Sequence, residues 1–255
     1  MSSASDIKLR HIVPSAVTAF AICAGMTSVR MSLEGNIEAA LYFILLAVFL
    51  DAADGKLARF LDCASPFGAE LDTLADFFNF GIVPGVLLYN TLYIGTEYDS
   101  LGFLATLVLA VCCALRLARF NLSVKTSDVS LKKDDHFVGV PAPALACLAL
   151  MPVFLHIIGW QDTDFPLVRA FYIMGVGFLA VSTIPTFSIK HASIKRAHLP
   201  FAVVLVMVLV VCLVVYPWPT LIAANCVYLA SLPLSWWAQQ RHRKAAQNKS
   251  ASDAN

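Results

Sequence analysis

The sequence predicts an all-helical integral membrane protein with about eight transmembrane helices and both termini in the cytoplasm. Three observations lead to this fold class: the composition, the apolar runs of helix length, and the distribution of basic residues. Hydrophobic residues make up 59% of the 255 residues and charged residues only 14%, and the mean hydropathy is +0.74. Such a composition excludes an ordinary soluble domain.

The apolar runs each approach the roughly 20 residues that a helix needs to span a bilayer. The first run is long for the apolar part of a signal peptide, and Arg30 follows it, so we interpret it as a spanning helix. Only Pro217-Trp218-Pro219 separates the last two runs. The predicted spans are Ile12–Val29, Ile37–Phe60, Asp72–Ile94, Leu101–Phe120, Val140–Gly159, Pro166–Ile184, Leu199–Tyr216 and Pro219–Trp237.

The basic residues test this count. With these spans, sixteen of the eighteen Lys and Arg residues fall on the side of the two termini, and only Arg30 and Arg169 fall on the other. The positive-inside rule then places both termini in the cytoplasm. We expect one transmembrane catalytic domain over residues 1–238 in the cell (inner or plasma) membrane. Residues 239–255 are basic and then polar, which predicts a disordered cytoplasmic tail.

Four aspartates interrupt the apolar pattern in the stretch DAADGKLARFLDCASPFGAELDTLAD, residues 51–76. Asp51 and Asp54 are three residues apart, and Asp72 and Asp76 are four apart, so each pair projects from one face of a helix. The segment between the pairs contains Pro and Gly and predicts a turn over residues 61–69, so that the two helices are antiparallel and the pairs face each other.

Carboxylates next to hydrocarbon are costly and usually mark a functional site. Four of them, with no His or Cys, suit a hard divalent cation such as Mg²⁺ or Mn²⁺ and are enough for two metals that share ligands. Two further features fit phosphate chemistry. Gly55 and Gly68 allow a ligand or a second backbone to approach closely, and Arg59 carries a fork of donors that matches a diphosphate.

The aspartate stretch also resembles a known signature. It reads D-x-x-D-G-x-x-A-R, eight residues, G-x-x-x-D-x-x-x-D from Asp51 to Asp76, which is similar to the motif of the CDP-alcohol phosphotransferase family at every fixed position. Three weaker motifs follow in order: RLARFN (116–121), FVGVPAPA (137–144) and STIPTFSIK (182–190). Together they resemble the phosphatidylserine synthase branch of that family. One departure is Pro14-Ser15, where family members often have Pro-Asn before a Thr such as Thr18.

The resemblance implies a fold, a reaction and a set of site residues. The reaction is the metal-dependent transfer of a phosphatidyl group from CDP-diacylglycerol to L-serine, giving phosphatidylserine and CMP at the cytoplasmic face of the membrane. Asp76 would also take the proton of the serine hydroxyl, and a homodimer is implied; no nucleic-acid partner is expected. The metal ligands would be Asp51, Asp54, Asp72 and Asp76, and the residues that bind CDP-diacylglycerol would be Ser15, Thr18, Gly55, Ala58, Arg59, Ser65 and Gly68.

The serine site is inferred from charge rather than from the resemblance. Arg116 and Arg119 are three residues apart near the cytoplasmic end of a predicted helix, followed by Asn121, so they are candidates for the serine carboxylate. Three alternatives stay open. One is another acceptor alcohol: glycerol 3-phosphate, inositol phosphate or choline. Another is an ion-coupled carrier, although its acids would be expected near the membrane midplane between two matching halves. The last is a structural membrane protein.

Overall fold

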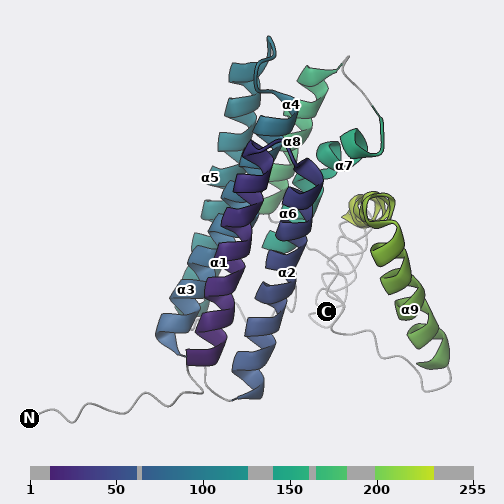
Figure 1. The fold of residues 1–255 in the computed structure, drawn as a ribbon. Coiled ribbons are helices and arrows are strands. Elements are labelled where there is room, and N and C mark those ends of the chain that lie inside the picture. Colours follow the sequence, from purple (N-terminus) through teal and green to yellow (C-terminus); the bar gives the residue numbers. More distant parts are fainter. Residues whose placement is uncertain (1–11, 62–64, 126–139, 161–164, 183–198, 233–255) are drawn as a thin grey trace, which may run out of the picture.

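The structure is a computed structural model that describes residues 12–61, 65–125, 140–160, 165–182 and 199–232, and every regular element in these ranges is helical (Figure 1). The predicted all-α class is therefore confirmed. A further helical stretch over residues 217–232 follows the last labelled helix. In chain order the elements are α1 (Ile12–Leu33), α2 (Ile37–Phe60), α3 (Pro66–Phe77), the π-helix η2 (Phe78–Ile82), α4 (Val83–Leu92), α5 (Asp99–Lys125), α6 (Ala142–Ala149), α7 (Met151–Ile157), α8 (Pro166–Val181) and α9 (Leu199–Val215).

Three segments of the described chain are long and apolar enough to cross a membrane: Ile12–Leu33, Pro66–Leu92 and Asp99–Leu122. Helix α2 has the necessary length, 24 residues, but its second half carries four charged residues. Helices α8 and α9 are apolar and shorter. The number of about eight spans and the side on which the termini lie remain predictions. The residues before position 12 and after position 232 lie outside the described part of the chain.

Two predicted boundaries were wrong. The expected span Val140–Gly159 is divided into α6 and α7, because Pro152 lacks a backbone N–H and its ring would clash with the carbonyl of residue 148 in a continuous helix. The expected turn over residues 61–69 is shorter than predicted. Helix α3 already begins at Pro66, and the Ser65 side chain caps it by accepting a hydrogen bond of 3.0 Å from the Gly68 amide.

Helices α1 and α2 form an antiparallel hairpin, and residues in the turn between them explain where each helix ends or begins. Gly35 has a φ of +80°, which ends α1, and the Asn36 side chain caps α2 by accepting from the Ala39 amide at 3.1 Å. Small residues recur on the buried face of α1, so the two backbones approach closely. This face consists of Pro14, Thr18, Ala21, Ala24, Gly25, Ser28 and Ser32.

The segment Pro66–Leu92 runs through the middle of the bundle, and its second half forms the core. Phe80, Val83, Leu87 and Leu88 are fully buried. Directly after Asp76, the chain passes through the π-helix η2, which adds a residue to one turn and often occurs beside functional sites. The side-chain amide of Asn79 in η2 is buried, and neither its Oδ1 nor its Nδ2 has a hydrogen-bond partner within the described residues.

The remaining helices complete the bundle around this core. Helix α8 packs against α5, and a Cβ at Gly177 would lie only 3.3 Å from the Leu109 Cα. The helical stretch 217–232 is attached by Trp218, which stacks on Phe154 with ring centroids 5.9 Å apart. Asn225 Nδ2 in the same stretch donates to the Cys147 carbonyl at 2.8 Å.

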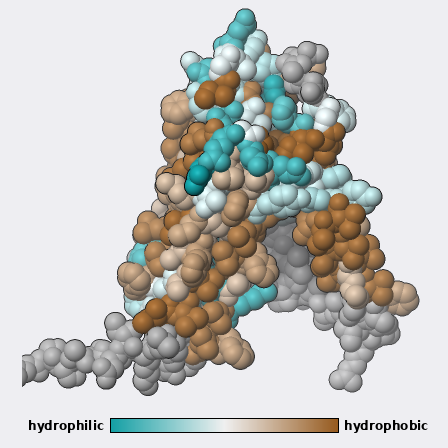
Figure 2. All heavy atoms as spheres, in the orientation of Figure 1, coloured by the Kyte–Doolittle hydropathy of each residue, from teal (hydrophilic) through white to brown (hydrophobic). Residues whose placement is uncertain are grey.

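On the face shown in Figure 2, hydrophobic residues dominate the middle and lower part of the bundle, and hydrophilic residues gather at its upper end. Large hydrophobic side chains point outward from several helices, for example Phe20, Phe49 and Phe171. All side chains described in α9 are exposed except Cys212, and nearly all of them are apolar. Exposed apolar surface of this extent is typical of helices that face lipid. Together with the apolar spans, it identifies a membrane protein.

Candidate active site

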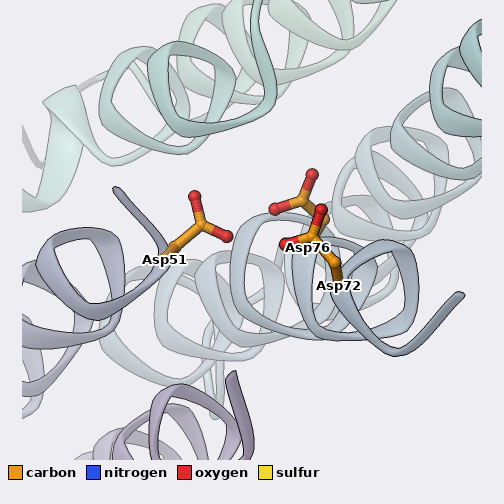
Figure 3. A group of neighbouring side chains, drawn as sticks. All are labelled: Asp51, Asp72 and Asp76. Carbon is orange, nitrogen blue, oxygen red and sulfur yellow. The ribbon is translucent and has the colours of Figure 1, made fainter. Parts of the chain in front are cut away.

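The structure brings three of the predicted carboxylates together near one end of the bundle. Asp51 on α2 faces Asp72 and Asp76 on α3 (Figure 3). One carboxylate oxygen from each lies within 4.8 Å of the others. Asp72 and Asp76 share a face because they are four residues apart in a helix. The antiparallel arrangement of α2 and α3 brings Asp51 opposite them, and we call these three residues the aspartate site.

The three carboxylates of the aspartate site repel one another unless a cation lies between them. At an effective dielectric constant of about 20, two unit charges 4.8 Å apart repel each other by roughly 3.5 kcal/mol, and three carboxylates make three such pairs. Among the described residues, the only ion pair within 4.0 Å joins Arg30 and Glu34, far along α1 from this site. Three carboxylate oxygens at this spacing, without nitrogen or sulfur donors, match the preference of Mg²⁺, Mn²⁺ and Ca²⁺. The donor set therefore fits a hard divalent cation.

Asp54 is held apart from that cluster. Its carboxylate is buried, with 3% exposure, and Oδ2 accepts a hydrogen bond of 2.5 Å from Thr18 Oγ1 on α1. Its Oδ1 is also buried and has no hydrogen-bond partner within the described part of the chain. A buried carboxylate oxygen without a donor is costly. Its position on the rim of the same cavity as Asp72 makes it a candidate for a second cation ligand.

A cavity of about 150 Å³ adjoins the aspartate site between α1, α2 and α3. A Cβ built at Gly55 would meet no described atom within 4 Å, so the helix surface there is open. At Gly68 a Cβ would lie 3.1 Å from Ser65 Oγ and 3.7 Å from Ser15 Oγ, so this glycine lets the two hydroxyls come close. The cavity is lined by Pro14, Ser15, Thr18, Asp54, Gly55, Ala58, Ser65, Gly68, Ala69 and Asp72.

Most of the residues predicted to bind the nucleotide lipid therefore line one cavity. The exception is Arg59, whose side chain is exposed on α2 and does not belong to the described lining. Arg59 follows Gly55 by one helical turn, so it lies on the same face of α2 as the open surface. A long arginine side chain could reach a ligand that extends out of the cavity.

The two arginines of the RLARFN motif have different surroundings. Arg116 is half-buried, and the titratable side chains close to its guanidinium include Cys113, Asp76 and Tyr228. Arg119 lies one turn further along α5, where its Nη1 donates to the Val181 carbonyl at 2.9 Å and so caps the end of α8. Asn121 Nδ2 donates to Thr73 Oγ1 at 3.1 Å and ties α5 to α3. Only Arg116 of these three lies beside the aspartate site.

Tyr228 was not predicted from the sequence. It comes from the helical stretch 217–232, and its hydroxyl is buried without a hydrogen-bond partner in the described part of the chain. A single tyrosine in an apolar run carries no sequence signal, and only the packing of the last helical stretch on the bundle brings it near Arg116. Parts of two sequence motifs, residues 137–139 of FVGVPAPA and 183–190 of STIPTFSIK, lie outside the described residues.

Comparison with known families and proteins gives an independent result. Residues 11–171 match a family model described as CDP-alcohol phosphatidyltransferase. Residues 199–233 match a second model, described as CDP-alcohol phosphatidyltransferase 2. The first match contains the whole aspartate stretch, the cavity lining and the RLARFN motif.

Several curated proteins are similar over most of the chain. A Mycobacterium tuberculosis protein is 34% identical over 261 residues, which cover 94% of this chain and 88% of that protein. A Mycobacterium leprae protein is 34% identical over 88% of this chain and 74% of its own length. A Bacillus subtilis protein is 32% identical over 72% of this chain and 94% of its own length. All three are named CDP-diacylglycerol–serine O-phosphatidyltransferase.

Proposed function

This chain belongs to the CDP-alcohol phosphatidyltransferase family, and from that membership we propose that it transfers the phosphatidyl group of CDP-diacylglycerol to L-serine, forming phosphatidylserine and CMP. The observation that carries the proposal is the arrangement of Asp51, Asp72 and Asp76 within 4.8 Å beside the cavity lined by Gly55 and Gly68. The names of the relatives supply the acceptor, since they specify serine.

Asp51, Asp72 and Asp76 would hold Mg²⁺ or Mn²⁺, with Asp54 as the further ligand of a two-metal site. When bound, the cation would neutralise the diphosphate and the phosphate of the departing CMP. The chain's contribution is to fix the ligands on two rigid helices. The Ser65 cap and the Thr18–Asp54 hydrogen bond support this rigidity, because they fix the start of α3 and join α1 to α2.

The cavity beside the aspartates accepts the diphosphate end of the donor lipid. Its volume of about 150 Å³ is below the range of about 300–1,000 Å³ usual for whole small-molecule sites, so it holds only part of the nucleotide lipid. Hydroxyls of Ser15 and Ser65 would donate to phosphate oxygens, and Arg59 would bind the part that extends outward. The acyl chains remain in the bilayer against the apolar outer faces of the helices.

Asp76 and Arg116 form the acceptor side of the site. Arg116 would bind the serine carboxylate, and Asp76 would accept the proton of the serine hydroxyl as its oxygen attacks the phosphatidyl phosphorus. The new P–O bond forms as the bond from phosphorus to the bridging oxygen of CMP breaks. Two charged groups at fixed separation orient serine, so positioning contributes a large part of the rate increase.

The remaining proposals concern the setting of the enzyme. The excess of Lys and Arg in the segments on the side of the aspartate site supports a location of this site at the cytoplasmic face of the cell membrane. We also propose a homodimer, on the basis of the family resemblance. Neither proposal changes the chemistry of the site.

The proposal is tested by CMP release from purified protein in mixed micelles of detergent and CDP-diacylglycerol with Mn²⁺ or Mg²⁺. Serine, glycerol 3-phosphate, inositol phosphate and choline are offered separately, and labelled serine is followed into the lipid fraction. We expect CMP release only with serine, equal in amount to the phosphatidylserine formed. Release with another acceptor would keep the aspartate chemistry and reject serine as substrate. No release with any acceptor, from folded protein, would reject the transferase.

A further inference from the structure

A second and larger cavity lies at the end of the bundle opposite the aspartate site. Its volume is about 590 Å³, and it is lined by residues from the end of α4, helix α7 and the start of α8. These elements lie in the upper part of Figure 1. Thr91 in its lining follows Asp76 by fifteen residues in one helical segment, which is roughly 22 Å at about 1.5 Å per residue. This cavity is therefore separate from the site of phosphatidyl transfer, and we call it the Arg169 cavity.

Arg169 is held at this cavity by a rigid support. Its guanidinium carbon lies 5.9 Å from the ring centroid of Tyr93, in range for a cation–π interaction. The Tyr93 ring is fully buried against Gly102 of α5, where a Cβ would clash with it. The Tyr93 hydroxyl also donates to the Pro166 carbonyl at 3.3 Å, at the start of the helix that carries Arg169. The guanidinium is therefore placed before any ligand arrives.

The charge of Arg169 is not balanced by the described protein. Its Nε is buried and has no hydrogen-bond partner among the described residues, and none of their carboxylates lies within 4.0 Å of it. Arg30 provides the contrast: it lies on the same side of the predicted membrane, is well exposed and pairs with Glu34 at 2.8 Å. Glu97 is the one acid in the described lining, and its side chain is exposed to solvent. A half-buried guanidinium with an unused donor favours an anion.

Two neighbouring groups add to this preference. Helix α8 begins at Pro166, and no described side chain caps its N-terminus, so its first amides and the helix dipole face the same region as Arg169. The Thr91 hydroxyl, also in the lining, is buried without a described hydrogen-bond partner. Within the described residues these donors have no side-chain acceptor, and a phosphate supplies acceptors in several directions.

The rest of the wall is apolar and suits a hydrocarbon chain. It includes Leu92, Met151, Pro152, Leu155, Trp160 and Val168. A soluble anion would use only the polar groups, whereas a lipid would use both parts of the cavity. Apolar side chains are also exposed around the cavity, among them Ile94 just after α4 and Phe171 on α8.

We propose that the Arg169 cavity binds a membrane phospholipid, with Arg169 on the phosphate and an acyl chain along the apolar wall. This inference goes beyond the proposed transfer reaction and does not depend on it. The lipid is a ligand of the membrane leaflet opposite the aspartate site. The cavity volume falls within the range of small-molecule sites.

Trp160 in the wall offers a direct test. Full-length protein in uncharged detergent micelles is titrated with phosphatidylglycerol that carries brominated acyl chains, which quench nearby tryptophans. The chain has four tryptophans, so the Trp160 signal is obtained by subtracting the signal of a Trp160→Phe variant. Diacylglycerol with the same brominated chains and no phosphate measures the contribution of the chains alone.

In the wild type, half-maximal quenching of Trp160 should need on the order of tenfold less phosphatidylglycerol than diacylglycerol, because only the former engages the guanidinium. Arg169→Gln should remove this difference, and Arg30→Gln, the matched loss of an arginine on the same side, should leave it unchanged. The thermal unfolding midpoint and CMP release of Arg169→Gln should stay close to the wild-type values, which shows that the variant is folded.

Equal quenching by the two lipids in the wild type would overturn the proposal without any variant. An unchanged preference in folded Arg169→Gln would also overturn it. Glycerol phosphate at millimolar concentration is added last, as a competitor that has the phosphate but no acyl chain. If it displaces the brominated phosphatidylglycerol, the ligand is a soluble phosphate ester, and the assignment to a membrane lipid is wrong.

Discussion

The aspartate site and the Arg169 cavity lie at opposite ends of one bundle and are complementary in charge. At one end three carboxylates gather without a described cation in ion-pair distance, and at the other a guanidinium lies without a described carboxylate. Within the described residues, neither end has an ion-pair partner for these charges. We infer that the first receives a divalent metal with a diphosphate and the second a single lipid phosphate. Charges next to hydrocarbon are retained where a ligand completes them.

The largest expected effect separates the two ends. Asp72→Asn should reduce CMP release by about a thousandfold or more, because it removes an anionic ligand of the metal that neutralises the reacting phosphate. Arg169→Gln should change CMP release by less than twofold, since it is roughly 20 Å away along the bundle. Both are measured by initial rates, with size-exclusion profiles to confirm intact protein. Comparable losses in the two variants would show that the ends are coupled.

Removing the metal should reduce CMP release nearly as much as Asp72→Asn does, and it should affect only the aspartate end. EDTA should abolish CMP release, and added Mn²⁺ or Mg²⁺ should restore it, because the carboxylates alone cannot neutralise the diphosphate. Quenching of Trp160 by brominated phosphatidylglycerol should not change on the same treatment. A loss of quenching in EDTA would indicate that the lipid site depends on metal.

The two arginines of α5 give a comparison within the aspartate end. Arg116→Lys should raise the KM for serine by about tenfold and leave the KM for CDP-diacylglycerol within twofold, because the fork that binds the carboxylate is lost. Arg119→Lys is the matched control. Its hydrogen bond to Val181 is structural, so it should lower stability by about 1 kcal/mol with little change in either KM. A larger serine effect for Arg119 would reverse the assignment.

The smallest effect concerns Gly55 on the open surface of α2. Gly55→Ala should raise the KM for CDP-diacylglycerol severalfold because the methyl group occupies ligand space, and it should raise stability by up to about 1 kcal/mol through helix propensity. Gly175→Ala on α8, where a Cβ also meets no described atom within 4 Å, should add similar stability. Its KM should be unchanged. An equal KM for both variants would place the donor lipid elsewhere.

The two ends also differ in how far they could be predicted. The aspartate site could be predicted because Asp51, Asp72 and Asp76 lie within one short stretch, where helical spacing and one turn determine which side chains meet. The Arg169 cavity combines residues from Thr91 to Tyr172 on separate segments. No local pattern relates them, so their proximity depends on tertiary packing.

Within the aspartate end, sequence reasoning could not anticipate the contacts between residues that are far apart in the chain. Arg116 and Arg119 are indistinguishable by spacing, and only the end of α8 at Val181 gives Arg119 a structural role. Tyr228 lies more than a hundred residues from Arg116 in the chain. The division of the span after Val140 into α6 and α7 was signalled by Pro152. The length of the apolar run nevertheless predicted one continuous span, because many transmembrane helices tolerate a proline.

The central claim is that the carboxylates of Asp51, Asp72 and Asp76 form a divalent metal site. Its most direct test is Mn²⁺ binding to the purified protein, followed by electron paramagnetic resonance of free and bound Mn²⁺ with CDP-diacylglycerol present. We predict binding by the wild type and by Arg169→Gln, and loss of binding in Asp72→Asn and in Asp51→Asn. Wild-type Mn²⁺ binding in folded Asp72→Asn would contradict the account, and so would the absence of bound Mn²⁺ in the wild type.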